Sequence, residues 1–175
     1  MVEMEENNMA TASMKDLKTG DLILFSESLW SRGMCASSVS HCVVVVCNRA
    51  GVPWALEITP EQGQPTLAPL ATYDCPLYVR SISRELPLSA AVEYVRLIRN
   101  DTYSHSYMAA MLGLSIDVSS PCCSTLVAGL YLFCGAMTGD ALKLLPGDFN
   151  CGHLPTTGGY SFGQLRLLSR GRQLL

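Results

Sequence analysis

The chain has 175 residues, of which 49% are hydrophobic and 15% charged, with a net charge of −3 at pH 7. This length and apolar content suit one globular domain with a buried core. The lack of a Lys/Arg cluster argues against a nucleic-acid surface, and the longest apolar run, Leu126–Met137, is too short to span a membrane. We therefore expect a disordered leader over residues 1–14 and one domain over residues 15–175.

Eight cysteines without a signal-peptide pattern predict reduced thiols in an intracellular, cytoplasmic compartment. Cys42 and Cys47 alone have a zinc-like spacing, but they lie at the two ends of a valine run that is typical of a strand. We therefore expect no metal site and no cofactor. Most of these thiols are expected to be small core residues, and a disulfide scaffold suits a chain with so much apolar material poorly.

The first half of the chain predicts strands. Residues 41–47 are apolar and rich in valine with no polar alternation, which is typical of a strand covered on both faces. A turn over residues 48–51 leads to a return strand, and residues 60–69 are predicted as a loop. The predicted strands are 22–25, 41–47, 53–58, 78–82 and 164–168.

Helical spacing begins at Leu88 and predicts an amphipathic helix over about residues 89–99. A second helix is expected over residues 103–114. A third follows Ser120, which suits the N-cap, and Pro121, which suits the first helical position; Gly135 lies just beyond its end. Strands first and helices later indicate an α+β fold.

Cys123 is the strongest candidate nucleophile. With Ser120 as the N-cap, it lies in the first helical turn, among unpaired amides and at the positive end of the helix dipole. That environment favours the thiolate, which is the reactive form of cysteine. Counting 100° per residue, Cys123 begins the buried stripe of the helix, whereas Cys122 points about 100° away.

A cysteine hydrolase also needs a base and a group that orients the base. His41 begins the valine strand, and Glu57 is a charged residue inside the apolar return strand, where a carboxylate is costly unless paired. An odd-numbered hairpin loop, or a bulge, would place both on one face, and an even loop would separate them. Each residue also has a structural interpretation: a hydrogen-bonded strand-end histidine, an edge-exposed glutamate and a core cysteine.

Two other histidines are alternative bases. His105 lies at a probable helix start beside Tyr103, and His153 lies in a loop rich in Gly and Pro. Both rank behind His41. Ser124 provides a hydroxyl at the helix start, although a local backbone hydrogen bond explains it as well.

Four segments together resemble one enzyme family: Leu17–Phe25 with its Gly20-Asp21 pair, Ser40–Val45, Leu56-Glu57 with Pro69–Tyr73 behind it, and Cys123–Ala128. They are similar to the L-x-x-GD strand, the S-H-hydrophobic strand, the strand with the third polar residue and the C-S-E-L-V-A helix of the circularly permuted, NlpC-like branch of papain-like cysteine hydrolases. This YiiX-like group includes poxviral members. The chain departs from its pattern at Val39, Cys122 and Thr125, where the group has an aromatic residue, Tyr or Phe, and Glu.

The resemblance implies a papain-like α+β fold, with an antiparallel sheet or half-barrel packed against helices, and a permuted order of His, Glu and then Cys. It implies a thiol hydrolase of the peptidase or amidase type, in which Cys123 is the nucleophile, His41 the base and Glu57 its orienting partner. Ser124, Tyr103 and Ser40 are expected near the oxyanion or the substrate.

Two other functions stay open: a lipid deacylase or acyltransferase that uses the same site, and a non-catalytic interaction module that kept the fold. The expected partner is a peptide, amide or acyl-lipid substrate. The resemblance also allows a viral protein acting inside a host cell. The sequence does not set the oligomeric state.

Overall fold

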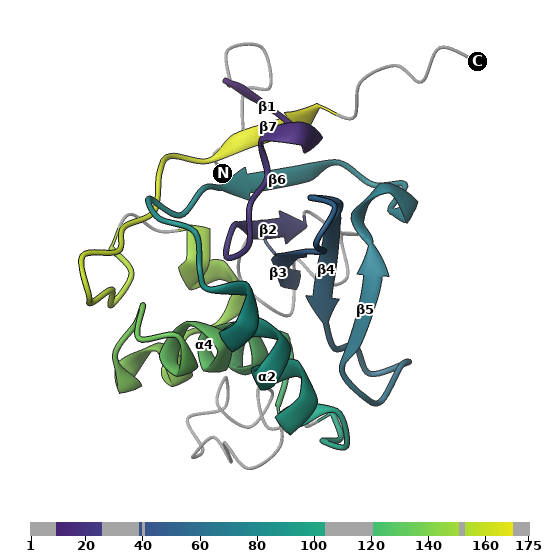
Figure 1. The fold of residues 1–175 in the computed structure, drawn as a ribbon, viewed down its shortest axis with the longest axis vertical. Helices are drawn as coiled ribbons and strands as arrows, with labels where there is room; N and C mark the ends of the chain where they lie inside the picture. Colours follow the sequence, from purple (N-terminus) through teal and green to yellow (C-terminus); the bar gives the residue numbers. More distant parts are fainter. Residues whose placement is uncertain (1–9, 26–38, 40, 104–120, 151–152, 170–175) are drawn as a thin grey trace.

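A computed structural model describes residues 10–25, 39, 41–103, 121–150 and 153–169. The described strands form one seven-stranded sheet in the order β1-β7-β6-β2-β3-β4-β5 (Figure 1). Neighbouring strands are antiparallel, except that β1 and β7 are parallel. The strands are β1 (Thr11–Ser13), β2 (Leu22–Phe25), β3 (His41–Cys47), β4 (Pro53–Glu57), β5 (Thr66–Pro69), β6 (Leu77–Arg80) and β7 (Arg166–Ser169).

Two α-helices of the described residues, α2 (Leu88–Ile98) and α4 (Cys123–Phe133), lie side by side below the sheet in Figure 1. The same part of the chain has four short 3₁₀ helices, η2 (Met14–Asp16), η3 (Leu70–Thr72), η4 (Gly139–Lys143) and η5 (Pro146–Asn150). Most strands come before the helices in sequence, so the predicted α+β class is confirmed.

The central strand β3 is buried on both faces, which explains its lack of polar alternation. Cys42 and Val44 belong to the apolar layer that contains the residues of α2 and α4. Val43 and Val45 belong to a second layer on the opposite face, which contains no residue of α2 or α4. Because each face has its own apolar layer, positions 42–47 of the strand all carry apolar side chains.

The Gly20-Asp21 pair joins three parts of the fold. Gly20 has φ +98°, and its carbonyl oxygen accepts a 2.8 Å hydrogen bond from the buried hydroxyl of Tyr131 in α4. The buried Asp21 carboxylate accepts hydrogen bonds from the amides of Lys18, at 3.1 Å, and Ile82, at 3.0 Å. The start of β2 is thereby attached both to α4 and to the chain that follows β6.

All five predicted strands are observed, and each end lies within two residues of its expected position. The predicted loop over residues 60–69 is wrong at its end, because residues 66–69 form edge strand β5 beside β4. The predicted leader over residues 1–14 is also too long: Thr11–Ser13 pairs with β7, and residues 14–16 form η2. β1 and β5 are short strands at the two edges of this sheet. Their formation depends on pairing with a neighbouring strand, which local sequence patterns do not reveal.

The helix predicted near residues 89–99 is observed as α2, Leu88–Ile98. The helix predicted over 103–114 lies outside the described residues, apart from Tyr103, which is not helical. Within the described part of the chain, neither helix has both the length and the apolar character needed to cross a membrane.

We predict that Gly20→Ala destabilises the fold more than Gly51→Ala. Both glycines have positive φ, so both substitutions carry backbone strain of about 1–2 kcal/mol. A Cβ at Gly20 would also lie 2.6 Å from Cγ of the buried Leu86, whereas nothing lies within 4 Å of a Cβ at Gly51. Overpacking should add about 1–3 kcal/mol to the loss in unfolding free energy, measured by urea denaturation. Equal losses in the two variants would contradict the steric argument.

Candidate active site

The β3–β4 hairpin brings His41 and Glu57 to the same face of the sheet. Val44 pairs with Leu56 and Cys47 with Pro53, so residues 48–52, an odd number, connect the strands. Continuing this register by one residue sets Glu57 opposite position 43, two residues from His41. The two side chains are therefore diagonal neighbours on one face, which is the arrangement that the sequence left open.

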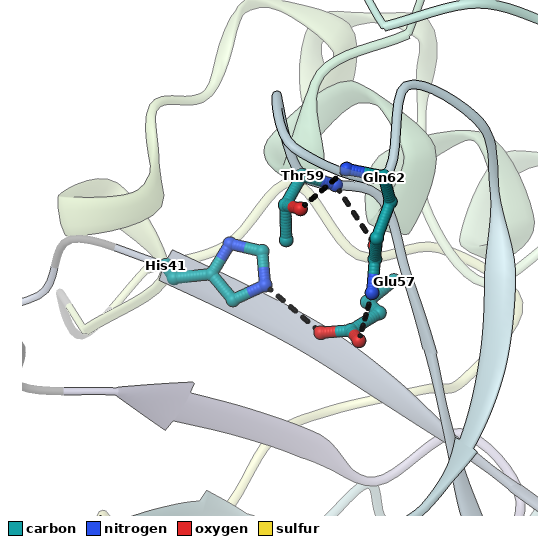
Figure 2. A network of polar contacts seen from close by, with 4 residues as sticks. All are labelled: His41, Glu57, Thr59 and Gln62. Carbon is teal, nitrogen blue, oxygen red and sulfur yellow. Dashed lines mark hydrogen bonds and ion pairs between the residues drawn. The ribbon is translucent and has the colours of Figure 1, made fainter.

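The Glu57 carboxylate is buried and receives one hydrogen-bond donor at each oxygen (Figure 2). His41 Nε2 lies 3.4 Å from Oε2, and Gln62 Nε2 donates to Oε1 at 2.8 Å. Burial acts to raise the pKa of Glu57, but the hydrogen bonds from His41 and Gln62 outweigh it and hold that pKa below its usual value. Glu57 is therefore a carboxylate at neutral pH, despite being only 5% exposed.

The imidazole of His41 is packed as well as hydrogen-bonded. Its side chain is 14% exposed, and its ring centroid lies 5.3 Å from that of Phe25, the residue directly across from it on β2. Burial acts to lower the pKa of His41, but hydrogen bonds and charge attraction from Cys123 and Glu57 raise it to about 10. The favoured state at neutral pH is an imidazolium held between two anions.

Helix α4 presents Cys123 at its first residue. The predicted start of the helix is wrong by two positions, since the N-cap is Cys122 rather than Ser120. Cys122 has an extended backbone, and its amide donates to Thr125 Oγ1 at 2.8 Å, while its sulfur accepts from the Thr125 backbone. This reciprocal pair replaces the usual serine cap. The predicted end is confirmed, because Gly135 has φ +67° and its amide bonds to the Leu132 carbonyl.

Two neighbouring side chains, Cys42 and His41, act on the pKa of the Cys123 thiol. Hydrogen bonding from the Cys42 side chain acts first to lower the pKa of Cys123; burial opposes this, and the bond and charge of His41 lower it further. Burial and the neighbouring Cys123 instead raise the pKa of Cys42. Of the two thiols, Cys123 is therefore the more acidic and Cys42 the less acidic.

The structure describes only some of the other residues that the sequence predicts near this site or as alternative bases. Ser124 is buried, with Oγ 3.3 Å from the Cys122 sulfur, so it supports the helix cap. Tyr103 reaches the loop between β4 and β5 through its backbone, since its amide donates to the carbonyl of Gly63 at 2.8 Å. Ser40 and the alternative base His105 lie outside the described residues. His153 lines a separate small pocket beside Arg80.

Three residues of the site were missed from the sequence. Gln62 lies in a loop with no pattern that would point to it, and Cys42 resembled one more core thiol. Tyr73 has a buried hydroxyl close to Glu57, and burial and that carboxylate raise its pKa. No group among the described residues lies in hydrogen-bonding geometry with this hydroxyl. The Pro69–Tyr73 segment was the only sequence signal that pointed to any of the three.

Comparisons with known proteins identify a fold relative. No protein-family model and no curated protein match the chain. Among solved structures, the chain is similar to the metalloprotein YiiX from Escherichia coli O157:H7, described as DUF1105, with a TM-score of 0.50 and 21% sequence identity. The match covers 65% of this chain and 64% of YiiX, so it spans less than two thirds of that protein. At this identity, the likeness shows the fold alone.

We predict that Cys42→Ala raises the apparent pKa of Cys123 by about one unit, because it removes a hydrogen bond to a charged group. The measurement is the pH dependence of iodoacetamide alkylation at Cys123, followed by mass spectrometry. Cys47→Ala is the matched control, since Cys47 is a buried thiol at the opposite end of β3. A shift no larger than that of the control would contradict the role of Cys42.

Proposed function

We propose that this protein is a thiol hydrolase that cleaves an amide bond, as a peptidase or amidase does. The observation that carries the proposal is the position of His41, whose Nε2 lies 3.4 Å from the Glu57 carboxylate and whose pKa is raised by both Cys123 and Glu57. A nucleophile, a base and an orienting group in that order are the minimal apparatus for acyl transfer. The three residues come from β3, β4 and the first residue of α4.

In the proposed mechanism, the Cys123 thiolate attacks the carbonyl carbon of the substrate. Because Nε2 of His41 faces Glu57, Nδ1 is the nitrogen that exchanges a proton with Cys123 and with the leaving amine. Protonation of the amine breaks the C–N bond and leaves a thioester on Cys123. Water then attacks the thioester and gives a proton to His41, and the acid and the thiolate are released.

The start of α4 supplies the stabilisation of the oxyanion. A helix leaves its first amides without intrahelical acceptors, and they lie at the positive end of the helix dipole. The backbone amide of Cys123 belongs to this group, because Cys123 is the first helical residue. An oxyanion that forms on the attacked carbon would lie beside this amide.

The fold likeness to YiiX supports assignment to the permuted, papain-like branch that the sequence motifs resemble, poxviral members included. YiiX is described as a metalloprotein. The described residues of this chain hold no group of three His, Cys, Asp or Glu side chains able to bind a metal ion. The six described cysteines are free, which suits a reducing, intracellular compartment.

The central prediction concerns the reactivity of Cys123. At neutral pH, Cys123 should be alkylated by iodoacetamide faster than the other cysteines, with an apparent pKa well below that of a free thiol. His41→Ala should slow this alkylation about tenfold or more, because the thiolate loses its imidazolium partner. The measurement is site-resolved mass spectrometry of the native protein over a range of pH.

An inert Cys123, or one indifferent to His41, would overturn the catalytic proposal and favour a non-catalytic interaction module. A reactive Cys123 would justify a substrate screen with peptides and phospholipids. Release of a fatty acid or acyl transfer from the phospholipid would replace the amidase proposal with a lipid deacylase or acyltransferase acting through the same three residues.

The pH profile tests Glu57. His41 must be protonated to release the leaving group, so hydrolysis should rise with pH through the Cys123 pKa and fall as His41 loses its proton near pH 10. Glu57→Gln removes one of the anions that raise the His41 pKa. The alkaline limb should then move down by about one pH unit. Glu93→Gln, on the exposed side of α2, is the charge-matched control, and an equal shift there would contradict the role of Glu57.

A further inference from the structure

Glu57 is held more closely by Gln62 than by the histidine it is proposed to orient. The Gln62 Nε2 to Glu57 Oε1 distance is 2.8 Å, whereas the His41 Nε2 to Glu57 Oε2 distance is 3.4 Å. The shorter value lies within the range of well-formed hydrogen bonds, and the longer value lies just beyond it. The direction of the carboxylate therefore depends strongly on Gln62.

The amide of Gln62 has only one orientation that satisfies its neighbours. Its Oε1 accepts from the Thr59 amide at 3.2 Å, and an acceptor at that position leaves Nε2 to face Glu57 (Figure 2). The Gln62 backbone amide in turn donates to Thr59 Oγ1 at 3.2 Å. Gln62 is an exposed loop residue, and an unanchored glutamine on a surface samples many rotamers. These two contacts with Thr59 select one of them.

The loop that carries Gln62 is itself anchored at its far end. The amide of Gly63 donates to the Thr59 carbonyl at 3.0 Å, and the Gly63 carbonyl accepts from the Tyr103 amide at 2.8 Å. The chain that follows α2 thereby stabilises the loop that carries Gln62. Hydrogen bonds thus run from the Tyr103 backbone to Gly63, through the Thr59–Gln62 turn, and on to the carboxylate.

We propose that Gln62 is a positioning residue of the Cys123–His41–Glu57 site, which fixes the Glu57 carboxylate and, through it, the orientation of the His41 ring. This inference rests on the proposed function. Among the described residues, the hydrogen bonds of Gln62 go to Thr59 and Glu57 and not to Cys123. Its effect must therefore pass through Glu57, and that requirement separates it from a residue that merely stabilises the loop.

The first test compares Gln62→Leu with Gln64→Leu in the full chain. Gln62→Leu removes the donor to Glu57, whereas Gln64→Leu makes the same change at an exposed residue of the same loop and leaves the contacts among Thr59, Gln62 and Glu57 in place. Gln62→Leu should slow alkylation of Cys123 at neutral pH about threefold to tenfold and raise its apparent pKa, as expected for an indirect loss of a charge-assisted hydrogen bond. Gln64→Leu should stay within about twofold of the wild type. Equal effects in the two variants would overturn the proposal.

A double-mutant cycle asks whether the effect passes through Glu57. In a Glu57→Ala background, Gln62→Leu should cause almost no further change in the alkylation of Cys123, because the group it positions is gone. An undiminished effect in that background would overturn the proposal. Circular dichroism and urea denaturation show whether each variant is still folded when the reactivity of Cys123 changes.

Gln62→Glu gives a signature that a structural role would not produce, and it carries the test if Gln62→Leu does not fold. Two carboxylates side by side repel, so Cys123 should react more slowly than in the wild type at neutral pH. On acidification, one of the two carboxyls takes a proton and can donate to the other, so the ratio to wild type should recover. A ratio that does not change with pH would count against the proposal. If His41→Ala does not affect Cys123, the proposed function fails; if His41 matters and Gln62 does not, only this inference fails.

Discussion

The pairing of Val44 with Leu56 sets the register of β3 against β4, and the candidate site depends on it. A slip of one residue would move the Glu57 carboxylate to the opposite face, away from His41, and would bury it without that partner. The apolar layers on both faces of β3 resist such a slip, because each contains a fixed set of alternating valines. The packing that stabilises the sheet therefore also positions the two polar side chains.

The neighbours of His41 lie on both faces of the sheet. Cys123 packs with the apolar layer that contains α4 and Cys42, whereas Phe25, the ring neighbour of His41, belongs to the opposite layer. A residue in the middle of β3 would reach one layer only. His41 is the first residue of the strand, so its ring can meet the carboxylate on one side and the start of the helix at the end of the sheet.

Much of this arrangement follows from local patterns, and its remainder follows from contacts that sequence does not encode locally. The valine run predicts β3, the apolar return segment predicts β4, and Gly135 predicts the end of α4. The face shared by His41 and Glu57 depends on the number of residues in the connection, which only the observed register defines. The start of α4 was misplaced because Cys122 and Thr125 cap it, and a cysteine cap has little statistical support. Gln62 acts through one amide in an irregular loop, where no periodicity exists to reveal it.

The thiolate–imidazolium pair also has a consequence for the stability of the fold. The His41 pKa rises from 6.5 to about 10 on folding, so its contribution is complete below pH 6.5 and is lost as pH rises through 10. The Cys123 pKa falls from 9.0, so its contribution is present above pH 9 and is lost as pH falls through the native value. Consider the pH range that lies below 9 and above both 6.5 and the native pKa of Cys123. In this range His41 and Cys123 together bind one proton in the native state and one proton in the unfolded state. The two slopes then cancel, so formation of the pair leaves no pH dependence in unfolding free energy over that range. The charge separation between His41 and Cys123 should for this reason be measurable in the reactivity of the sulfur rather than in the stability of the fold.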